Sequence, residues 1–395
     1  MKPVTSHQSP VTSHMIKIGI TGQAGFVGTH LYNTLGLYPV EFARVPFEDE
    51  FFEDPSKLEA FVKECDAIVH LAAMNRHGDP QVIYDTNIRL VNQLIEAMEK
   101  TGSAPHLLFS SSTQEESDNP YGRSKKEGRN LFGQWADKNN AQFSGFIIPN
   151  VFGPFGHPFY NSVIATFCHQ LTRNETPRIE VDTEIKLIYV SELVKHFIDI
   201  IELMRNQHGS HCVIDEIAVQ PTSKIRVSTL LKVLQTYKTN YFSHGEIPSL
   251  DNPFKLNLFN TFISYIDHQS FFPLKLKKNT DDRGSFVETV KLNSGGQVSF
   301  STTVPGITRG NHFHTRKAER FVVIKGKARI QLRKIGTDKI MSFELNGNQP
   351  SFVDMPVWHT HNITNTGDEE LYTIFWINEF YDSADPDTFF EAVEK

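Results

Sequence analysis

Tyr121 and Lys125 lie four residues apart in the stretch Tyr-Gly-Arg-Ser-Lys. On a helix this spacing places both side chains on one face, where they can contact the same ligand. A neighbouring ammonium group favours the phenolate of a tyrosine, whose pKa is ordinarily about 10, and so allows proton exchange near neutral pH. A hydroxyl of Ser111 or Ser112 ends the preceding apolar run and can hold a carbonyl oxygen beside the tyrosine. These residues predict acid–base chemistry at a carbonyl group.

Three glycines with the spacing G-x-x-G-x-x-G follow the apolar run of residues 15–21. The pattern predicts a strand, a tight turn and a helix. Gly22, Gly25 and Gly28 have no Cβ, so a dinucleotide pyrophosphate can lie against the amides at the helix N-terminus, where the dipole favours negative charge. An ordinary glycine turn without a ligand is the alternative, since the spacing differs from G-x-G-x-x-G.

Strand and helix patterns alternate after this turn. Strands are expected over residues 39–44, 67–73 and 106–112, and helices over residues 57–65 and 80–100. The strand at 67–73 ends in Ala72 and Ala73, small residues that allow a cofactor to approach. This alternation predicts a Rossmann-like α/β domain with a doubly wound parallel sheet.

Arg44 ends the second expected strand, where a dinucleotide-binding domain normally carries an acidic residue for the ribose hydroxyls. An arginine at this place suits a 2′-phosphate, so NADPH is favoured over NADH as the cofactor. A solvated Arg44 without a ligand is the alternative.

Residues 15 to about 260 resemble the extended short-chain dehydrogenase/reductases that act on nucleotide sugars. The resemblance implies a catalytic set of Ser112, Tyr121 and Lys125, because the third serine of such a strand usually holds this place. The implied cofactor site consists of Gly22, Gly25, Phe26, Val27, Gly28, Arg44, Ala72, Ala73, Asn87, Tyr121, Lys125 and Asn150. Asn150, in Pro-Asn-Val-Phe-Gly-Pro, also lines the implied substrate site, although the arginine that usually precedes it is missing.

The sequence changes character after residue 268, where short strand patterns and turns recur and predict an all-β region. His312 and His314 alternate along one expected strand and therefore share a face. With Glu319 they fit the pattern G-x5-H-x-H-x4-E-x6-G, which resembles the first motif of the cupin β-barrels. Residues 356–365 resemble the second cupin motif and supply His361.

Two features of the second motif leave its ligand open. Trp358 stands where a glycine is usual, and His359 competes with His361 because both lie on one face. The implied metal ligands are His312, His314, Glu319 and His361. Three imidazoles and a carboxylate suit Zn²⁺ or another borderline divalent ion.

The segments around Arg283 and Arg309 resemble the deoxysugar 3,5-epimerase branch of the cupins, typified by RmlC. This resemblance implies that both arginines bind the nucleotide diphosphate, a bidentate task that suits a guanidinium. It also implies that the histidine after Arg-Gly is the base. His312 is then either a metal ligand or the base.

Composition narrows the class of protein. A chain of 395 residues suggests two domains, here 15–268 and 269–395. The repeated pentamer within residues 1–14 suggests a disordered tail or a non-native remnant.

A net charge of −7 argues against a nucleic-acid partner. Three separated cysteines disfavour a disulfide framework and indicate a reducing, cytoplasmic compartment. No apolar run approaches the roughly 18–20 residues that span a bilayer, so no membrane insertion is expected.

A reductase followed by an epimerase-like cupin resembles the bifunctional capsule and O-antigen enzymes of the CapF, WbjC and FnlB type. The resemblance implies that the cupin epimerises C3 of UDP-2-acetamido-2,6-dideoxy-4-hexulose. The reductase then reduces C4 with NADPH to give UDP-2-acetamido-2,6-dideoxy-L-talose, a precursor of UDP-N-acetyl-L-fucosamine. The partner would be this UDP-linked deoxy amino sugar, and a homodimer is expected. Two alternatives remain: a monofunctional reductase with a structural or dimerising cupin, and a non-catalytic NADP-binding sensor.

Overall fold

The computed structural model describes residues 15–205 and 213–395, which form two compact units. The described residues within 1–148 and 191–219 form the first unit, and residues 149–190 and 220–395 form the second. The tail expected at residues 1–14 lies outside the described residues. The domain boundary expected at residue 268 stays a prediction.

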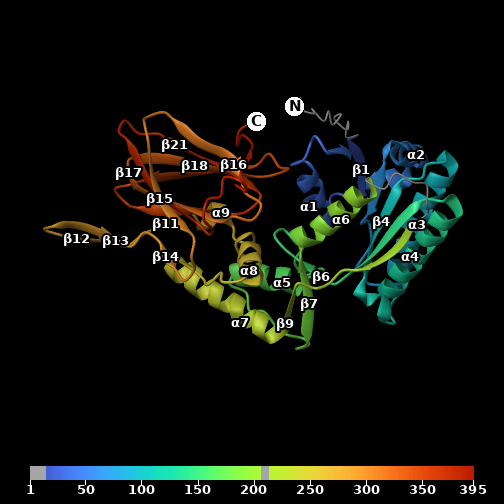
Figure 1. The fold of residues 1–395 in the computed structure, drawn as a ribbon. Helices are drawn as coiled ribbons and strands as arrows, with labels where there is room; N and C mark the ends of the chain where they lie inside the picture. Colours follow the sequence, from blue (N-terminus) through green and yellow to red (C-terminus); the bar gives the residue numbers. More distant parts are fainter. Residues whose placement is uncertain (1–14, 206–212) are drawn as a thin grey trace, which may run out of the picture. The chain divides into compact units, whose positions relative to one another are not determined.

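A six-stranded parallel sheet lies at the centre of the first unit, in the order β2-β1-β3-β4-β5-β8 (Figure 1). Its strands are β1 (Ile16–Thr21), β2 (Phe42–Val45), β3 (Ala67–His70), β4 (His106–Ser112), β5 (Gln142–Ile148) and β8 (Val213–Ala218). The α-helices are α1 (Phe26–Leu35), α2 (Pro55–Glu64), α3 (Pro80–Thr101), α4 (Pro120–Asn139) and α6 (Val190–Arg205). Short 3₁₀ turns are η1 (Asp49–Glu53) and η2 (Thr113–Glu116).

Helices cover both faces of this sheet, α1 and α6 on one side and α2, α3 and α4 on the other (Figure 1). From β1 the chain moves to β2 at one edge and then crosses back to β3, so the strand order reverses between β1 and β3. Open α/β sheets bind their ligands at the carboxyl ends of the strands beside such a reversal. The Rossmann-like fold class expected for the N-terminal part is confirmed.

One expected strand is shorter than its pattern indicates. The pattern over residues 67–73 predicts a strand to Ala73, but β3 ends at His70. The side-chain amide of Asn87 binds the N–H of Met74 at 2.7 Å and its carbonyl oxygen at 3.1 Å, groups that a continuing strand would pair with its neighbours. Ala72 and Ala73 therefore lie in the loop between β3 and α3.

The second unit begins with a helical lobe, defined here as residues 149–190 and 220–271. Its three-stranded sheet contains β6 (Asn150–Phe152), β7 (Glu184–Tyr189) and β9 (Ser223–Arg226). Its helices are α5 (Val163–Thr172), α7 (Val227–Tyr237), the π-helix η3 (Lys238–Phe242), α8 (Pro253–Ile263) and α9 (His268–Phe271). The short strand β10 (Glu246–Ile247) of the lobe pairs with β14 (Lys291–Leu292).

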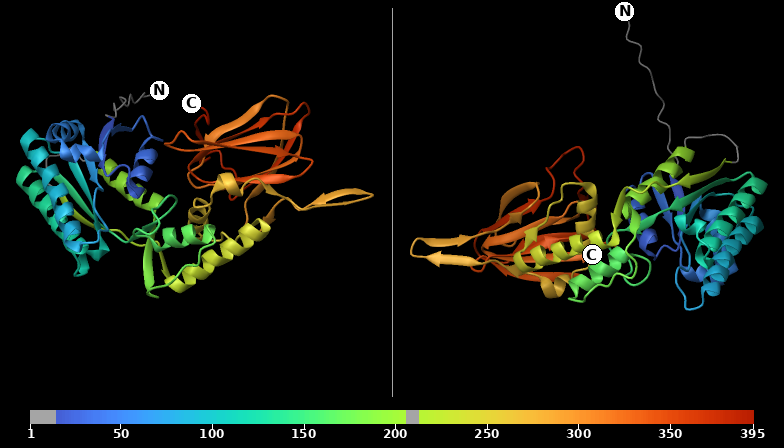
Figure 2. Two further views of the ribbon diagram at one scale, coloured as in Figure 1. Left: turned by 180° about the vertical axis from the view of Figure 1, so that it is seen from behind. Right: turned by 90° about the horizontal axis from the view of Figure 1, so that it is seen from below.

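The rest of the second unit is all-β, as expected, and is called the barrel here (residues 274–395). Its first sheet has the order β11 (Leu274–Lys275), β20 (Ser351–Met355), β17 (Glu319–Lys325), β22 (Leu371–Ile377) and β15 (Gln297–Thr303). Its second sheet has the order β19 (Ile340–Asn346), β18 (Lys327–Lys334), β21 (His359–Asn365), β16 (Thr308–Phe313) and β23 (Phe389–Phe390). A separate hairpin of β12 (Lys278–Asp281) and β13 (Gly284–Val287) projects from the barrel (Figure 2).

One hydrophobic core joins the lobe and the barrel. Phe259 and Phe262 of α8 belong to the same cluster of buried residues as Val322 of β17 and Ile330 of β18. The core of the first unit is a separate cluster, in which Phe132 of α4 packs against the sheet. Two cores, rather than one, therefore organise the described chain.

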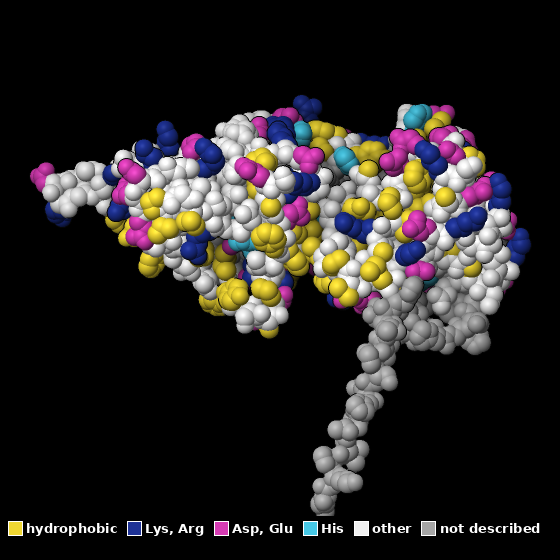
Figure 3. Space-filling model, turned by 90° about the horizontal axis from the view of Figure 1, so that it is seen from above, with side chains coloured by type: hydrophobic (Ala, Val, Ile, Leu, Met, Phe, Trp, Pro, Cys, Tyr) yellow, Lys and Arg dark blue, Asp and Glu magenta, His cyan; other side chains and the backbone are white. Residues whose placement is uncertain are grey.

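The surface carries charges of both signs. On the face in Figure 3, Lys and Arg side chains are interspersed with Asp and Glu. Among the described helices, none combines the length and the apolar character needed to cross a membrane.

Candidate active site and metal centre

The glycine turn after β1 has the close contacts that only glycine permits. Gly22 has a φ of +71°, and a Cβ there would lie 2.8 Å from the backbone nitrogen of Ala72. A Cβ on Gly28 would lie 2.3 Å from the carbonyl oxygen of Gly22. Gly25 is exposed at the start of α1, which has no side-chain cap. Because the first N–H groups of a helix have no partner within it, this end of α1 suits a phosphate.

The first turn of α1 contains the predicted cofactor residues Phe26, Val27 and Gly28. Arg44, predicted to meet a 2′-phosphate, is exposed in β2. Its guanidinium carbon lies 4.3 Å from the ring centroid of Tyr32, and Nη1 donates to the Tyr32 carbonyl oxygen at 3.3 Å. The stacking holds Arg44 beside α1, and its role as a phosphate ligand stays a prediction.

Asn87 links two segments that flank the predicted cofactor site. It is 5% exposed on α3, and besides its bonds to Met74 it donates to the hydroxyl of Ser124 on α4 at 2.9 Å. The hydroxyl of Ser124 in turn donates to the carbonyl oxygen of Tyr121 at 2.7 Å. Asn87 therefore ties the β3–α3 loop to the first turns of α4.

Lys125 is buried on α4, one helical turn after Tyr121. Its ammonium donates to the carbonyl oxygen of Ser110 at 2.8 Å and lies 5.8 Å from the centroid of the Tyr121 ring. Burial lowers the pKa of Lys125 to about 8, although the nearby charge of Glu115 opposes this shift. The structure thus brings Tyr121 and Lys125 together, as their spacing predicts.

The two candidate serines have different surroundings. Ser111 is buried, and its hydroxyl donates to Glu115, which also pairs with Arg129 at 2.8 Å. Ser112 is only partly buried, and its hydroxyl oxygen accepts the N–H of Gln114 at 3.2 Å, a bond that does not use the O–H. Ser112 is the better placed of the two to contact a ligand.

Asn150, the remaining residue predicted for the reductase site, is the exposed first residue of β6 in the second unit. Its side-chain amide donates to the carbonyl oxygen of Lys186 at 3.3 Å, beside β7. Its predicted contacts with cofactor and sugar stay predictions.

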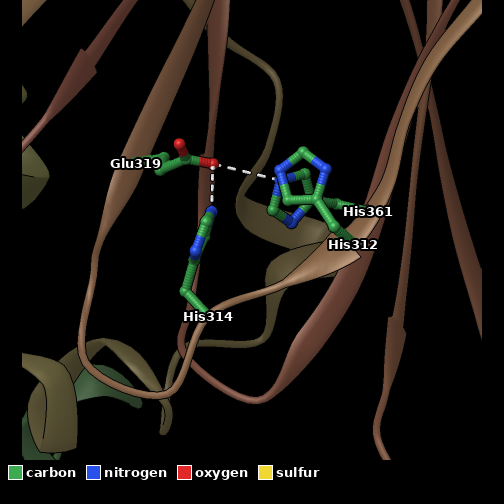
Figure 4. A group of neighbouring side chains, drawn as sticks. All are labelled: His312, His314, Glu319 and His361. Atoms are coloured by element: carbon green, nitrogen blue, oxygen red, sulfur yellow. Dashed lines mark ion pairs between the residues drawn. The ribbon is translucent and has the colours of Figure 1, made fainter. Parts of the chain in front are cut away.

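Four side chains from three strands and a turn converge in the barrel (Figure 4). They are His312 on β16, His314 just after β16, Glu319 at the start of β17 and His361 on β21. One ligand atom from each residue lies within 4.8 Å of those of the other three. The nearest approaches to Oε2 of Glu319 are Nε2 of His361 at 3.0 Å and Nε2 of His314 at 3.2 Å.

The centre of this His/Glu cluster contains hydrogen-bond acceptors without a donor between them. Nδ1 of His314 and of His361 face the carbonyl oxygens of Asp387 and His359, which can only accept, so both rings carry their proton on Nδ1 when neutral. Both Nε2 atoms and Oε2 of Glu319 are buried with no hydrogen-bond partner. A proton on either Nε2 would make an ion pair with Glu319, whereas a cation shared by these atoms would satisfy all three at once, so the residues fit a divalent metal.

The electrostatics of the cluster agree with a cation site. Burial alone would raise the pKa of Glu319, but its close pairing with the His314 and His361 rings holds that pKa well below its usual range. Burial and the neighbouring His361 lower the pKa of His312 to about 4, so its ring is neutral at pH 7. The pKa of His314 is raised, because its interactions with Glu319 and Asp387 outweigh its burial, so this imidazole carries positive charge more readily than a free one. Three imidazoles and a carboxylate are donors that suit Zn²⁺.

His359, the competitor of His361, has other contacts. Its ring stacks at 6.1 Å on that of His268, and its Nδ1 faces the carbonyl oxygen of Val357 at 3.1 Å. Trp358 has a φ of +60°, which explains why glycine is usual at this place. The backbone N–H of Trp358 donates to the His314 carbonyl oxygen at 2.8 Å, and the indole ring stacks on Phe313 with the ring centroids 5.7 Å apart. The structure therefore groups His361, and not His359, with the other three predicted ligands.

The predicted diphosphate ligands lie on separate elements. Arg283 is at the tip of the β12–β13 hairpin, where its side chain is 89% exposed and pairs with Asp281 at 2.6 Å. Arg309 is exposed on β16, three residues before His312. Their binding of diphosphate stays a prediction.

Comparison with known proteins assigns the family. The NAD dependent epimerase/dehydratase family model matches residues 18–214, and the polysaccharide biosynthesis C-terminal domain model matches residues 279–389. A Pseudomonas aeruginosa protein, UDP-2-acetamido-2,6-beta-L-arabino-hexul-4-ose reductase, is 33% identical over 380 residues, which cover 95% of this chain and 98% of that protein. The crystal structure of the capsular polysaccharide assembling protein CapF from Staphylococcus aureus matches with 35% identity and a TM-score of 0.59, covering 95% of this chain and 100% of CapF. The chain belongs to the CapF-type family.

This membership establishes the coarse function. CapF-type proteins are nucleotide-sugar enzymes of the reductase/epimerase kind in capsular polysaccharide biosynthesis, and the match to the epimerase/dehydratase model implies an NAD(P) cofactor. A shorter similarity, 27% identity over 123 residues, relates 29% of the chain to 82% of the spore coat polysaccharide biosynthesis protein SpsL of Bacillus subtilis.

Sequence reasoning missed one positioning residue of this CapF-type enzyme, Gly122. A Cβ on Gly122 would lie 2.0 Å from the carbonyl oxygen of Gln114, so α4 approaches η2, which follows β4, only because this residue is glycine. The N–H of Gly122 donates to Oδ1 of Asn119, the N-cap of α4, at 2.8 Å. Glycine is a poor helix former, and its place directly after Tyr121 in a helix was the available signal.

Proposed function

We propose that this CapF-type protein is a bifunctional enzyme whose barrel epimerises C3 of UDP-2-acetamido-2,6-dideoxy-4-hexulose and whose first unit reduces C4 with NADPH. The product is UDP-2-acetamido-2,6-dideoxy-L-talose, on the path to UDP-N-acetyl-L-fucosamine. The observation that carries the proposal is that one chain contains both a Tyr121–Lys125 pair and a His/Glu cluster of facing acceptors. The name of the Pseudomonas aeruginosa relative supports the choice of sugar.

In the reductase half, Tyr121 donates its phenolic proton to O4 of the ketone as the carbonyl carbon is reduced. Ser112 donates a hydrogen bond to the same oxygen and orients it. Lys125, as an ammonium beside the Tyr121 ring, stabilises the phenolate left behind. NADPH, when bound at the glycine turn, supplies the hydride, and Arg44 binds its 2′-phosphate.

In the epimerase half, His312, His314, Glu319 and His361 hold a divalent metal, with Zn²⁺ the best fit to their donor atoms. A metal bound there supplies positive charge that stabilises a developing enolate oxygen. Arg283 and Arg309 bind the diphosphate, and Asn150 contacts the sugar in the reductase half.

The order of the two steps follows from carbon acidity. The proton on C3 is labile only while C4 is a ketone, because the resulting carbanion is delocalised onto the ketone oxygen. Reduction of C4 removes this stabilisation. Epimerisation therefore precedes reduction.

We also propose a homodimer, on the basis of apolar side chains exposed on the barrel. Phe286 on the projecting hairpin is 66% exposed, and Val298 and Phe300 on the edge strand β15 are 55% and 72% exposed. A second copy that covered these residues would bury apolar surface and satisfy the unpaired edge of β15.

Proton NMR of the 4-keto UDP sugar in D₂O, first without and then with NADPH, tests the proposed function. Loss of the C3 proton signal without NADPH, followed by an L-talo product on its addition, is expected. Reduction without C3 exchange would contradict the epimerase half of the proposal. If neither exchange nor reduction occurred, both halves would be contradicted.

One observation favours a second candidate, a reductase with a structural barrel. The barrel and the lobe share a hydrophobic core, so the barrel stabilises the lobe whether or not it is catalytic. The same NMR experiment separates the candidates, since a structural barrel leaves the C3 proton in place.

A further inference from the structure

Asp387 is buried near the C-terminus, between β22 and β23. It is 4% exposed, and its carboxylate accepts hydrogen bonds from the N–H groups of Thr315, Arg316 and Lys317 at 3.1, 3.0 and 3.1 Å. The Thr315 hydroxyl donates to it at 2.7 Å. These residues form the turn between His314 and β17, so one carboxylate fixes that whole turn.

The backbone of Asp387 acts on His314 directly. Its carbonyl oxygen accepts the N–H of Nδ1, which leaves Nε2 of His314 as a lone pair directed towards Glu319. Imidazoles that bind metals in proteins usually donate their second nitrogen to a carbonyl or a carboxylate, which sets the tautomer and orients the ring. Asp387 therefore fixes His314 through two groups. Its carbonyl oxygen binds the imidazole ring, and its carboxylate binds the turn that follows His314.

The residues after Asp387 also bind β16, the strand that contains His312. In β23, Phe390 pairs with His312. The N–H of Val393 donates to Oδ1 of Asn311 at 3.2 Å, and the buried Arg333 of β18 donates to the carbonyl oxygen of Val393 at 2.8 Å. The C-terminal segment thus closes the edge of the sheet that contains His312 and His361.

We propose that Asp387 is a positioning residue for the metal site and that residues 387–393 set the affinity of this site for a divalent cation. The inference rests on the proposed metal function of the barrel. It goes beyond that function because Asp387 acts through His314 and is not itself a ligand. A carboxylate that only stabilised the fold would not change the affinity for the metal.

The test is the Zn²⁺ affinity of the full-length chain, prepared metal-free and titrated in competition with a chromophoric chelator. We expect Asp387→Ala to weaken Zn²⁺ binding by about 10–100-fold, the usual effect of removing a group that orients a ligand. The matched control is Asp382→Ala, because Asp382 is exposed in the same segment and accepts the N–H of Ala384. The control is expected to bind Zn²⁺ like the wild type. Visible spectra of the Co²⁺-loaded proteins should differ only for the Asp387 variant.

Two results would overturn the inference in distinguishable ways. If wild type and Asp387→Ala bind Zn²⁺ equally, Asp387 does not position the site although the metal function stands. If the wild type binds neither Zn²⁺ nor Co²⁺, the proposed metal function fails and the inference fails with it. Should Asp387→Ala not fold, Asp387→Asn decides, because it keeps one acceptor oxygen: weaker Zn²⁺ binding supports the inference, and wild-type affinity overturns it.

Discussion

The phenolic oxygen of Tyr121 carries the proton that the proposed reduction transfers to O4. Tyr121→Phe removes it and keeps the ring beside the Lys125 ammonium. We expect reduction of the 4-keto sugar to fall by about 10²–10⁴-fold, the typical share of general acid catalysis. NADPH oxidation, followed by absorbance, measures this loss. Exchange of the C3 proton should continue, because the barrel residues are unchanged.

The control for this variant is Tyr84→Phe. Tyr84 lies on α3 in the same unit, and its hydroxyl donates to Glu127 on the outer side of α4. Wild-type rates of reduction are expected for the control. Undiminished reduction by Tyr121→Phe would remove Tyr121 from the proposed mechanism.

Lys125 gives the reductase a pH limit. Burial lowers its pKa to about 8, so its ammonium is lost as the pH rises through that value. Since the proposed role of Lys125 requires the charged form, we expect kcat/KM of the reduction, which follows the titration of the free enzyme, to decline above about pH 8. A kcat/KM that stayed constant to pH 10 would contradict the role.

The contribution of Lys125 to the free energy of unfolding should rise over the same pH range in which the reduction becomes slower. The folded-state pKa of Lys125 lies below its ordinary value of 10.5, so between about pH 8 and 10.5 the unfolded chain binds more protons at this residue than the folded chain does. The contribution of Lys125 to the unfolding free energy therefore rises with pH in this window. Denaturant unfolding at each pH distinguishes loss of the ammonium from loss of the fold.

At the level of single residues, the sequence predicted that Tyr121 and Lys125 lie together. It did not decide by itself between candidate residues that are close in the sequence. The four-residue spacing was sufficient for Tyr121 and Lys125, because it acts within one helix. The choice of Ser112 over Ser111 depends on the burial of Ser111 against Glu115, and that of His361 over His359 on the contact of His359 with His268. The contact of His359 with His268 joins distant parts of the chain and leaves no local pattern. Ser111 and Glu115 are only four residues apart, but their spacing alone does not show that the Ser111 hydroxyl is buried.

The junction of β4 with α4 is the element-level feature that positions Tyr121. Gly122→Ala would place a Cβ 2.0 Å from the Gln114 carbonyl oxygen, so the first turn of α4 must move. We expect a loss of about 1–3 kcal/mol in unfolding free energy, as for other overpacked sites, together with a lower kcat. Denaturant unfolding and the rate of reduction measure the two effects.

Gly78→Ala is the matched control, because a Cβ on Gly78 meets nothing within 4 Å. It should change the unfolding free energy by no more than about 0.5 kcal/mol. If Gly122→Ala behaved like this control, the close approach of α4 to η2 would not determine the position of Tyr121.

Elements were predictable where periodicity and caps agreed. The helix expected over residues 80–100 is α3, which begins with Pro80 after the cap Asp79 and ends at Thr101, where Gly102 caps it in the left-handed conformation. The end of β3 was not predictable in the same way. Small apolar residues continue the strand pattern beyond His70, and the bonds from Asn87 that end it come from another element.

At the scale of the whole chain, the change from helical to strand patterns near residue 268 does not coincide with a gap in packing. Arg320 of β17 pairs with Asp354 of β20 at 2.7 Å and donates to the carbonyl oxygen of Gly245 in the lobe at 2.6 Å. The hydroxyl of the fully buried Tyr241, also in the lobe, donates to Asp354. Sequence patterns report local periodicity, so they could not show that Gly245 and Tyr241 contact residues more than 70 positions away.

This shared core predicts how a chain shortened to residues 15–268 behaves. Its lobe would lose the barrel side of the core and leave Tyr241 without Asp354, and breaking such a buried network is strongly destabilising. Amides in α7 and α8 should therefore exchange with D₂O far faster than in the full chain, as measured by mass spectrometry. NADPH binding should persist, because residues 15–148 and 191–219 have a separate core, and this separates a melted lobe from general misfolding. Protection of α7 and α8 equal to that in the full chain would show instead that residue 268 ends an independently folding domain.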